Sequence, residues 1–355
     1  MARDVAIVGT AQRPSQVGTV LTSVELILPV IDEVIAKVGV DRREIGFWCH
    51  GSCDYMSGQP FSFVAAVDAI GAWPPIVESH VEADGALALY EAWVKIQTGE
   101  CDTAVVFSNG KTTSGPIDQI LTLQADPYFV APLWPGFDTL AALQARMCLE
   151  AGVVSERAMA EVAVRSRRDA RSNAVAWPPA SMGDHSVDEL LATPYVRDPL
   201  RAHDLPVAVD GANAVVLAAG DVARRLSPRP AWIRGFDHRI DTQRLGARSL
   251  VESNSARVAG RVAGVNADKI DVAELHAPYT HQELLLVQAL GLDPQRTRIN
   301  PSGGALVANP AMAAGLARFA EAADAVTSGR ADRAVAHCTS GPCLQQNLVC
   351  VLEGE

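Results

Sequence analysis

The sequence alternates twice between short runs of β-branched residues and longer stretches with the apolar spacing of amphipathic helices. In the first half we expect strands at 4–10, 45–51 and 102–108 and helices at 23–38 and 83–97. The elements expected in the second half are strands at 231–236, 269–275, 333–338 and 347–352 and helices at 250–263, 280–290 and 311–328. Two halves with the same element order indicate a duplicated fold with its functional site where the halves meet.

Two of the strand segments show what kind of sheet these elements form. The runs DTAVVFS at 102–108 and ANAVVLAAG at 212–220 are apolar on both faces, which is typical of strands in a covered, mostly parallel sheet. The fold class is therefore α/β. The intervening sequence is richer in Pro, Trp and Arg, and we interpret it as an insertion or lid. The predicted division is an N-terminal half at 1–110 and 206–227, an insertion at 111–205 and a C-terminal half at 228–355.

The composition excludes several classes of protein. The 355 residues carry a net charge of −11 and 48% hydrophobic residues, so a core can form. There is no Lys/Arg-rich tract, so neither nucleic acid nor an anionic membrane surface is an expected partner. No apolar run approaches the roughly 18 residues that span a bilayer, and no secretory leader is recognisable, so we expect a cytoplasmic protein.

The seven cysteines are scattered, which does not suggest a disulfide framework. Cys49, His50 and Cys53 lie close together, but no second cluster of ligands follows them. We therefore expect reduced thiols and no bound metal.

Five segments carry a resemblance to a known family. They are VEADGALALYEAW at 81–93, the stretch at 198–221, DVAELHAPYTHQELL at 271–285, NPSGGALVANPAMAAG at 300–315 and RAVAHCTSG at 333–341. In this order and spacing they resemble the thiolase superfamily, especially the branch of sterol carrier protein thiolases and "lipid-transfer" thiolase-like proteins, which is similar to steroid side-chain aldolases. The resemblance implies a duplicated five-layered αβαβα fold with two related mixed sheets and an inserted loop and helical region.

The resemblance also implies where a nucleophile would lie. Thiolases place a reactive cysteine at the N-terminus of a buried helix, where the helix-end amides stabilise a thiolate. At the matching place, three residues before Gly85, this sequence has Glu82 and no nearby thiol. A carboxylate there suits base or binding chemistry better than acyl transfer, and the alternative is an ordinary carboxylate at a helix N-terminus.

The other catalytic positions of the family are retained in part. His276 and Tyr279 match the motif that places a histidine after a strand, and Cys338 matches the cysteine that shuttles a proton at the reacting carbon. Asn309 replaces a second histidine; it can donate a hydrogen bond to a carbonyl but cannot take a proton. The alternative interpretation of His276 and Cys338 is that both are core residues.

Two further sets of residues are candidates for substrate binding. By resemblance, the NPSGG loop lies beside the acyl thioester, which makes Asn300, Ser302, Gly303 and Gly304 candidates. An arginine cluster that includes Arg165 and Arg168 is a candidate for the phosphates of coenzyme A, because guanidinium groups bind phosphate in a bidentate manner; a solvated helix face is the alternative.

These residues favour a carbon–carbon lyase that cleaves a β-hydroxyacyl-CoA, for example a steroid side chain, by a retro-aldol reaction. Glu82, His276 or Tyr279 would be the base, Asn309 and backbone amides would hold the enolate oxygen, and Cys338 or Tyr279 would be the acid. The alternatives are a non-catalytic or half-catalytic subunit that binds acyl-CoA beside an active partner, and a divergent acetyl-CoA acyltransferase.

The expected partners follow from the same interpretation. CoA thioester is the expected substrate, and no bound cofactor is expected. We expect a homodimer, or a heterodimer with a thiolase-like homologue, formed through the strand at 102–110. The resemblance to the aldolases adds a small OB-fold protein with a zinc ribbon as a partner.

Overall fold

The computed structural model describes residues 3–58, 60–176 and 183–355, and it contains a ten-stranded mixed sheet. The strands follow one another across the sheet in the order β10-β9-β11-β12-β8-β1-β7-β4-β2-β3. Their bounds are β1 Val5–Gln12, β2 Phe47–Ser52, β3 Glu78–Glu82, β4 Thr103–Lys111, β7 Asp210–Ala219, β8 Ala231–Ile240, β9 Val272–Leu275, β10 Arg298–Ile299, β11 Arg333–Ser340 and β12 Gln346–Glu353. A separate two-stranded sheet pairs β5 (Tyr195–Arg197) with β6 (Leu200–Arg201).

The large sheet consists of two halves with the same internal order. Counting from the middle outward, β1-β7-β4-β2-β3 corresponds strand for strand to β8-β12-β11-β9-β10. The halves join where β1 meets β8, through only two residue pairs, Ala6 with Trp232 and Ile7 with Ala231. The duplicated α/β fold predicted from the sequence is confirmed.

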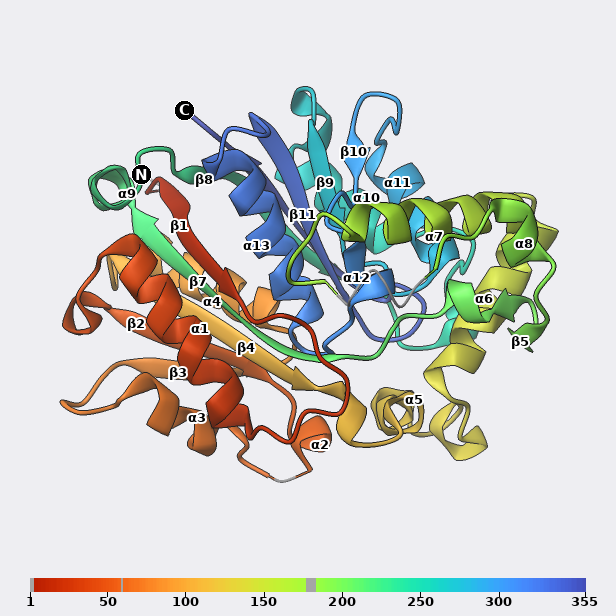
Figure 1. The fold of residues 1–355 in the computed structure, drawn as a ribbon, viewed down its shortest axis with the longest axis horizontal. Coiled ribbons are helices and arrows are strands. Elements are labelled where there is room, and N and C mark those ends of the chain that lie inside the picture. The colour runs from red at the N-terminus through yellow and green to blue at the C-terminus, as the bar shows by residue number, and fades with distance from the viewer. Residues whose placement is uncertain (1–2, 59, 177–182) are drawn as a thin grey trace.

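The helices form layers on both sides of and between the two half-sheets (Figure 1). Helices α4 and α13 pack against each other and against strands of both halves, with α1 and α3 covering the outer face of one half and α10 and α11 covering the other. The bounds of the longer helices are α1 Ser23–Val38, α3 Phe63–Ile70, α4 Gly85–Gln97, α6 Phe137–Glu150, α7 Glu156–Ala170, α9 Gly220–Leu226, α10 Asn254–Ala263, α11 Thr280–Leu290 and α13 Ala314–Thr327. The short ones are α2 Asp54–Ser57, α5 Ile117–Ile120, α8 Val187–Leu191 and α12 Gly304–Val307.

Local signals explain why α1 forms where it does. Thr22 accepts a hydrogen bond from the backbone of Glu25, whose side chain accepts one from the backbone of Thr22, so two helix-end donors are satisfied. The helix ends at Gly39, which has φ of 72°, a conformation that costs glycine little. The face toward the sheet is apolar and buried: Leu26, Ile27, Val30, Ile31 and Val34.

The segment between β4 and β7 contains the helices α5 to α8 and the small β5–β6 sheet, and none of its described residues adds a strand to the large sheet. It corresponds to the region that we interpreted as an insertion. Within the described residues, no helix is both long and apolar enough to cross a membrane.

The structure corrects the expected dimer contact. The strand at 102–110 is β4, which hydrogen-bonds to β7 on one side and β2 on the other and so has no free edge. Its apolar sequence reflects burial inside the sheet rather than an interface. The outer strand of this half is β3, which pairs only with β2. Its polar sequence ESHVE lacks the apolar pattern of the inner strands, so no strand was predicted there.

Candidate active site

A pocket of about 250 Å³ lies where the two halves meet the inserted segment. Its wall is mostly apolar, and none of the described residues that line it is a Lys or Arg. The polar side chains that line it are Asp84, Thr112, Asp118, Gln124, Asp138, His276, Tyr279, Gln282, Asn309, Thr339 and Ser340.

Asp84 is the N-cap of α4 and is fully buried beneath this pocket. Its carboxylate accepts hydrogen bonds from three backbone N–H groups, those of Ala86 (2.9 Å), Gly315 (2.8 Å) and Leu316 (2.9 Å). The last two belong to the first turn of α13, so the positive ends of two helices meet at one carboxylate. Burial nevertheless raises the pKa of Asp84.

The close approach of the two helices requires glycine at position 315. A Cβ atom there would lie 2.3 Å from the sulfur of Cys338 and 2.5 Å from Oδ1 of Asp84. The sulfur of Cys338 lies beside Asp84 because glycine leaves this space open. Burial and the neighbouring Asp84 raise the pKa of Cys338 well above the usual value for a thiol, so Cys338 is a protonated thiol at neutral pH.

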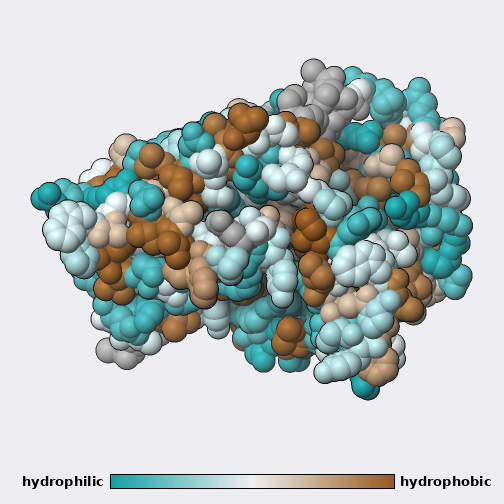
Figure 2. All heavy atoms as spheres, turned by 90° about the horizontal axis from the view of Figure 1, so that it is seen from below, coloured by the Kyte–Doolittle hydropathy of each residue, from teal (hydrophilic) through white to brown (hydrophobic). Residues whose placement is uncertain are grey.

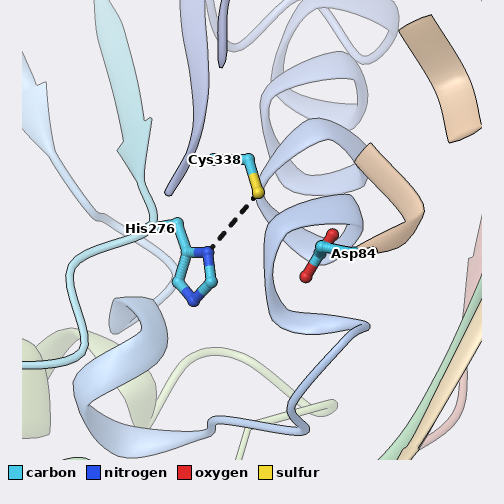
Figure 3. A group of neighbouring side chains, drawn as sticks. All are labelled: Asp84, His276 and Cys338. Atoms are coloured by element: carbon cyan, nitrogen blue, oxygen red, sulfur yellow. Dashed lines mark hydrogen bonds between the residues drawn. The ribbon is translucent and has the colours of Figure 1, made fainter. Parts of the chain in front are cut away.

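His276 completes a buried trio with these two residues (Figure 3). Its Nδ1 lies 3.7 Å from the sulfur of Cys338 and accepts a hydrogen bond from the backbone N–H of Thr339 at 3.4 Å. Burial, reinforced by the charge of Arg318, lowers the pKa of His276 to about 4. The ring is therefore neutral near pH 7, with its proton on Nε2.

The ligand atoms of Asp84, His276 and Cys338 lie within 4.8 Å of one another, a spacing at which such groups can hold a metal ion. Both oxygens of Asp84 and Nδ1 of His276, however, already accept hydrogen bonds from backbone N–H groups. These acceptor atoms therefore have few lone pairs left for a metal ion.

A second polar pair lies on the pocket wall. The hydroxyl of Tyr279 donates a hydrogen bond of 2.8 Å to Oδ1 of Asp138, which belongs to the first turn of α6. The backbone N–H of Asp138 in turn donates to Oδ1 of Asp118 at 2.7 Å. This pair joins the C-terminal half to the inserted segment.

Of the predicted catalytic residues, His276, Tyr279 and Asn309 line the pocket, whereas Cys338 lies behind the pocket wall next to His276. The buried Oδ1 of Asn309 has no hydrogen-bond partner among the described residues. The side chain of Asn309 also lies close enough to the ring of His276 to raise the pKa of that ring, so it faces both His276 and the pocket.

Glu82 lies outside this group. It is the exposed last residue of β3, and its Oε1 accepts a hydrogen bond of 2.7 Å from the backbone N–H of Asp54. The place at the N-terminus of α4 belongs to Asp84, because β3 continues through Glu82 and the helix begins only at Gly85.

The NPSGG loop also lies away from the pocket. Asn300 accepts from the backbone of Leu275 and donates to Glu283, and Ser302 donates to Glu274. Gly303 and Gly304 have φ of 95° and 69°, which favour glycine. These contacts connect β9, β10 and α11, and none of the four predicted residues lines the pocket.

Arg165 and Arg168 face a different cavity. Arg165 pairs with the buried Glu283 and Arg168 with Asp169. Together with Arg296 and Arg298 they line a groove of about 440 Å³ that shares no residue with the pocket.

The sequence interpretation missed Asp84 and Asp138. Asp84 had a visible signal, because an aspartate directly before a helical Gly-Ala-Leu-Ala run is a common N-cap. Asp138 had none, since its partner Tyr279 is 141 residues away in the chain.

Comparison with known proteins agrees with the fold. No family model matches the chain. It is 29% identical over 275 residues to an acetyl-CoA acetyltransferase of Methanothermobacter thermautotrophicus, which is 70% of each protein.

Two solved structures are similar over nearly the whole chain. One is an Ltp2–ChsH2(DUF35) aldolase, with a TM-score of 0.80 at 19% identity, covering 99% of this chain and 97% of that one. The other is human mitochondrial 3-ketoacyl-CoA thiolase, with a TM-score of 0.79 at 15% identity and 99% of both chains covered. The chain has the thiolase fold, and its structural neighbours include both thiolases and an aldolase.

Proposed function

We propose that this protein is a carbon–carbon lyase that cleaves a β-hydroxyacyl-CoA thioester by a retro-aldol reaction. The observation that carries the proposal is Asp84. It caps the N-terminus of the buried helix α4, the kind of place where the resemblance to thiolases implies a nucleophilic thiol, and Cys338 lies beside both Asp84 and His276. A buried carboxylate held by three backbone amides is a poor acyl acceptor, so acyl transfer through an enzyme thioester is unfavourable.

The remaining residues suit the steps of such a cleavage. Loss of the β-hydroxyl proton breaks the bond between the α and β carbons, and the electron pair moves onto the thioester as an enolate. The Nε2–H of neutral His276 and the amide of Asn309 are donors for the enolate oxygen. The thiol of Cys338 then protonates the α carbon, and the resulting thiolate recovers a proton from solvent.

The residues of the pocket wall favour a substrate with an uncharged acyl group. Among the described residues the wall is mainly apolar and offers the carboxylates of Asp84, Asp118 and Asp138 rather than Lys or Arg, which disfavours a second anionic group on the acyl chain. A neutral polycyclic side chain, such as a steroid, is compatible with these properties and is included in the proposal.

The residues of the NPSGG loop and the two arginines Arg165 and Arg168 remain proposed contacts of the substrate outside the pocket. If coenzyme A phosphates bind in the arginine groove, we expect Arg296 and Arg298 to contribute as well, because carboxylates already occupy Arg165 and Arg168.

A partner protein is also part of the proposal. The aldolase neighbour is named as a pair of proteins, Ltp2 and ChsH2(DUF35). Beside the pocket residue Gln124, this chain exposes four large apolar side chains in the inserted segment, Tyr128, Phe129, Leu133 and Trp134. Figure 2 shows that apolar and polar residues alternate in small patches on the face seen from below. We propose that a small acyl-CoA-binding protein docks beside the pocket.

The experiment is an assay of the purified chain, alone and with the small proteins encoded beside it, on a panel of β-hydroxyacyl-CoA thioesters. We expect release of a carbonyl compound and a shortened acyl-CoA, and no CoA-dependent thiolysis of β-ketoacyl-CoA. Thiolysis without cleavage would favour the acyltransferase alternative. Tight acyl-CoA binding without either reaction would favour a non-catalytic subunit.

A further inference from the structure

The proposed reaction needs a group that accepts the β-hydroxyl proton, and the trio of Asp84, His276 and Cys338 does not provide one readily. Cys338 holds its own proton, and Nδ1 of His276 is occupied by the backbone N–H of Thr339. Asp84 is held by backbone amides. The base must therefore come from another part of the pocket wall.

Tyr279 lies on that wall but is not a base by itself. The side chain is buried, and burial together with the charge of Asp138 raises the pKa of the phenol well above 10. The phenol therefore keeps its proton at neutral pH. That proton points at Asp138, and the hydroxyl makes no other hydrogen bond within the described part of the chain, so its oxygen can accept one from a ligand.

The position of Asp138 and the raised pKa of its carboxyl group suit it to receive a proton. Its position in the first turn of α6 and the hydrogen bond from its backbone N–H to Asp118 fix the carboxylate against the pocket. Burial raises the pKa of Asp138, the hydrogen bond from Tyr279 lowers it, the nearby Asp118 raises it and Arg197 lowers it, with a net rise. A carboxylate with a raised pKa is a stronger base near neutral pH than an exposed one.

We propose that Asp138 is the terminal base of the cleavage and that Tyr279 relays the proton to it; the inference rests on the proposed lyase function. The β-hydroxyl of the substrate donates to the phenol oxygen of Tyr279 while the phenol donates to Asp138. As the bond between the α and β carbons breaks, the hydroxyl proton moves to Tyr279 and the phenol proton moves to Asp138. The β carbon becomes a carbonyl, and the electron pair of the broken bond forms the enolate at the other end of the pocket.

The relay separates the two proton transfers in space. The acid that protonates the α carbon, Cys338, belongs to β11, whereas the terminal base belongs to α6 of the inserted segment. The inserted segment thus supplies a catalytic residue in addition to closing the pocket.

The test compares Asp138→Asn with wild type in the cleavage assay. The asparagine can still accept the hydrogen bond from Tyr279 but takes no proton, so kcat should fall about 10²-fold or more while KM changes little. In wild type the rate should decline as the pH falls through the pKa of Asp138, and this acid limb should be absent in the variant. Asp138→Glu should restore part of the rate.

Two further variants separate a relay from a structural contact. Tyr279→Phe should lower kcat to a similar extent, and the double variant should be no slower than the slower single variant, because the two residues act as a unit. Glu150→Gln is the control, since Glu150 is exposed at the end of the same helix and lies outside the pocket.

The outcomes distinguish the relay from the proposed function. An active wild type with an equally active Asp138→Asn variant, or one that keeps the acid limb, overturns the relay alone. A folded wild-type protein that cleaves no β-hydroxyacyl-CoA, with or without its partner, overturns the proposed function and the relay with it.

Discussion

Asp84 and Glu82 are carboxylates two residues apart in entirely different surroundings, which makes them a matched pair for mutation. Asp84→Asn replaces one acceptor oxygen with an amide that faces the backbone N–H groups of α13. Losing a hydrogen bond to a charged acceptor costs about 1.5–3 kcal/mol, and we expect a lyase rate about 10-fold lower because the ends of α4 and α13 are then no longer fixed beside the pocket. The change should also lower the free energy of unfolding measured in urea.

Glu82→Gln is the control for this experiment. Because Glu82 is exposed and its carboxylate contacts the backbone of Asp54 and the ring of His80, neither of which lines the pocket, we expect an unchanged rate and a stability change within about 0.5 kcal/mol. A loss of rate in the Glu82 variant with full activity in the Asp84 variant would contradict the assignment.

At this scale the sequence predicted part of the arrangement around the pocket, and the catalytic roles stay predictions. His276 follows strand β9, Tyr279 directly precedes helix α11 and Cys338 lies within strand β11, so strongly patterned elements position all three. The carboxylate at the N-terminus of α4 is Asp84 rather than Glu82, and the polar strand β3 carries no apolar signal that would mark where the strand ends.

Among the elements, β3 has the open edge of the N-terminal half. It pairs only with β2, and exposed apolar side chains lie near it in the chain, including Trp73 and Val77. An open strand edge beside apolar surface favours pairing with a second copy. We expect a dimer through β3, which light scattering would detect as twice 37.6 kDa.

Val77→Lys tests this contact, because it adds a charge at a position that is 63% exposed in the single chain. The variant should be monomeric and remain folded. Val196→Lys, at an exposed valine of β5, is the matched control and should remain dimeric. A wild type that is monomeric at micromolar concentration would show that β3 is not an interface.

Helices were predicted more accurately than edge strands. The bounds of α1 and α11 agree with the expected 23–38 and 280–290, because both end at a glycine with positive φ and α1 in addition has a regular apolar face. The pairing of Tyr279 with Asp138 depends on how the inserted segment folds back over the pocket, and no local pattern in the sequence records that.

For the whole molecule, the four of the five buried histidines whose pKa values fall to about 4 or below dominate how stability responds to acid. Burial lowers the pKa of His276 to about 4 and the pKa values of His50, His281 and His337 to about 3. The unfolded chain binds these protons near pH 6.5, so it holds more protons than the folded chain below that pH. Stability should be complete above pH 6.5 and should fall as the pH decreases toward 4, by about 1.4 kcal/mol per unit for each histidine.

Calorimetry between pH 8 and 5 measures this loss of stability. The raised pKa values of the buried Asp84 and Glu274 partly oppose the loss, because these groups bind protons more readily in the folded chain than in the unfolded chain. His281→Gln keeps a donor for Gln144 and should reduce the slope by about one proton, whereas the exposed His185→Gln should leave it unchanged. A melting temperature that is flat down to pH 5 would show that the buried histidines do not control acid stability.

The meeting of α4 and α13 at a single carboxylate has a consequence for how such a chain can diverge. The two helices hold equivalent places in the two halves, yet α4 is capped by Asp84 and α13 begins after Ala313. A polypeptide of half this length would have to associate with itself to build the same centre, and both helices would then carry the same capping residue. Across the two-fold axis of such a dimer, either two capping carboxylates would face each other or no carboxylate would be present. Only tandem halves in one polypeptide allow a single anion to lie between two helix ends, so an asymmetric reaction centre depends on the covalent link between the halves.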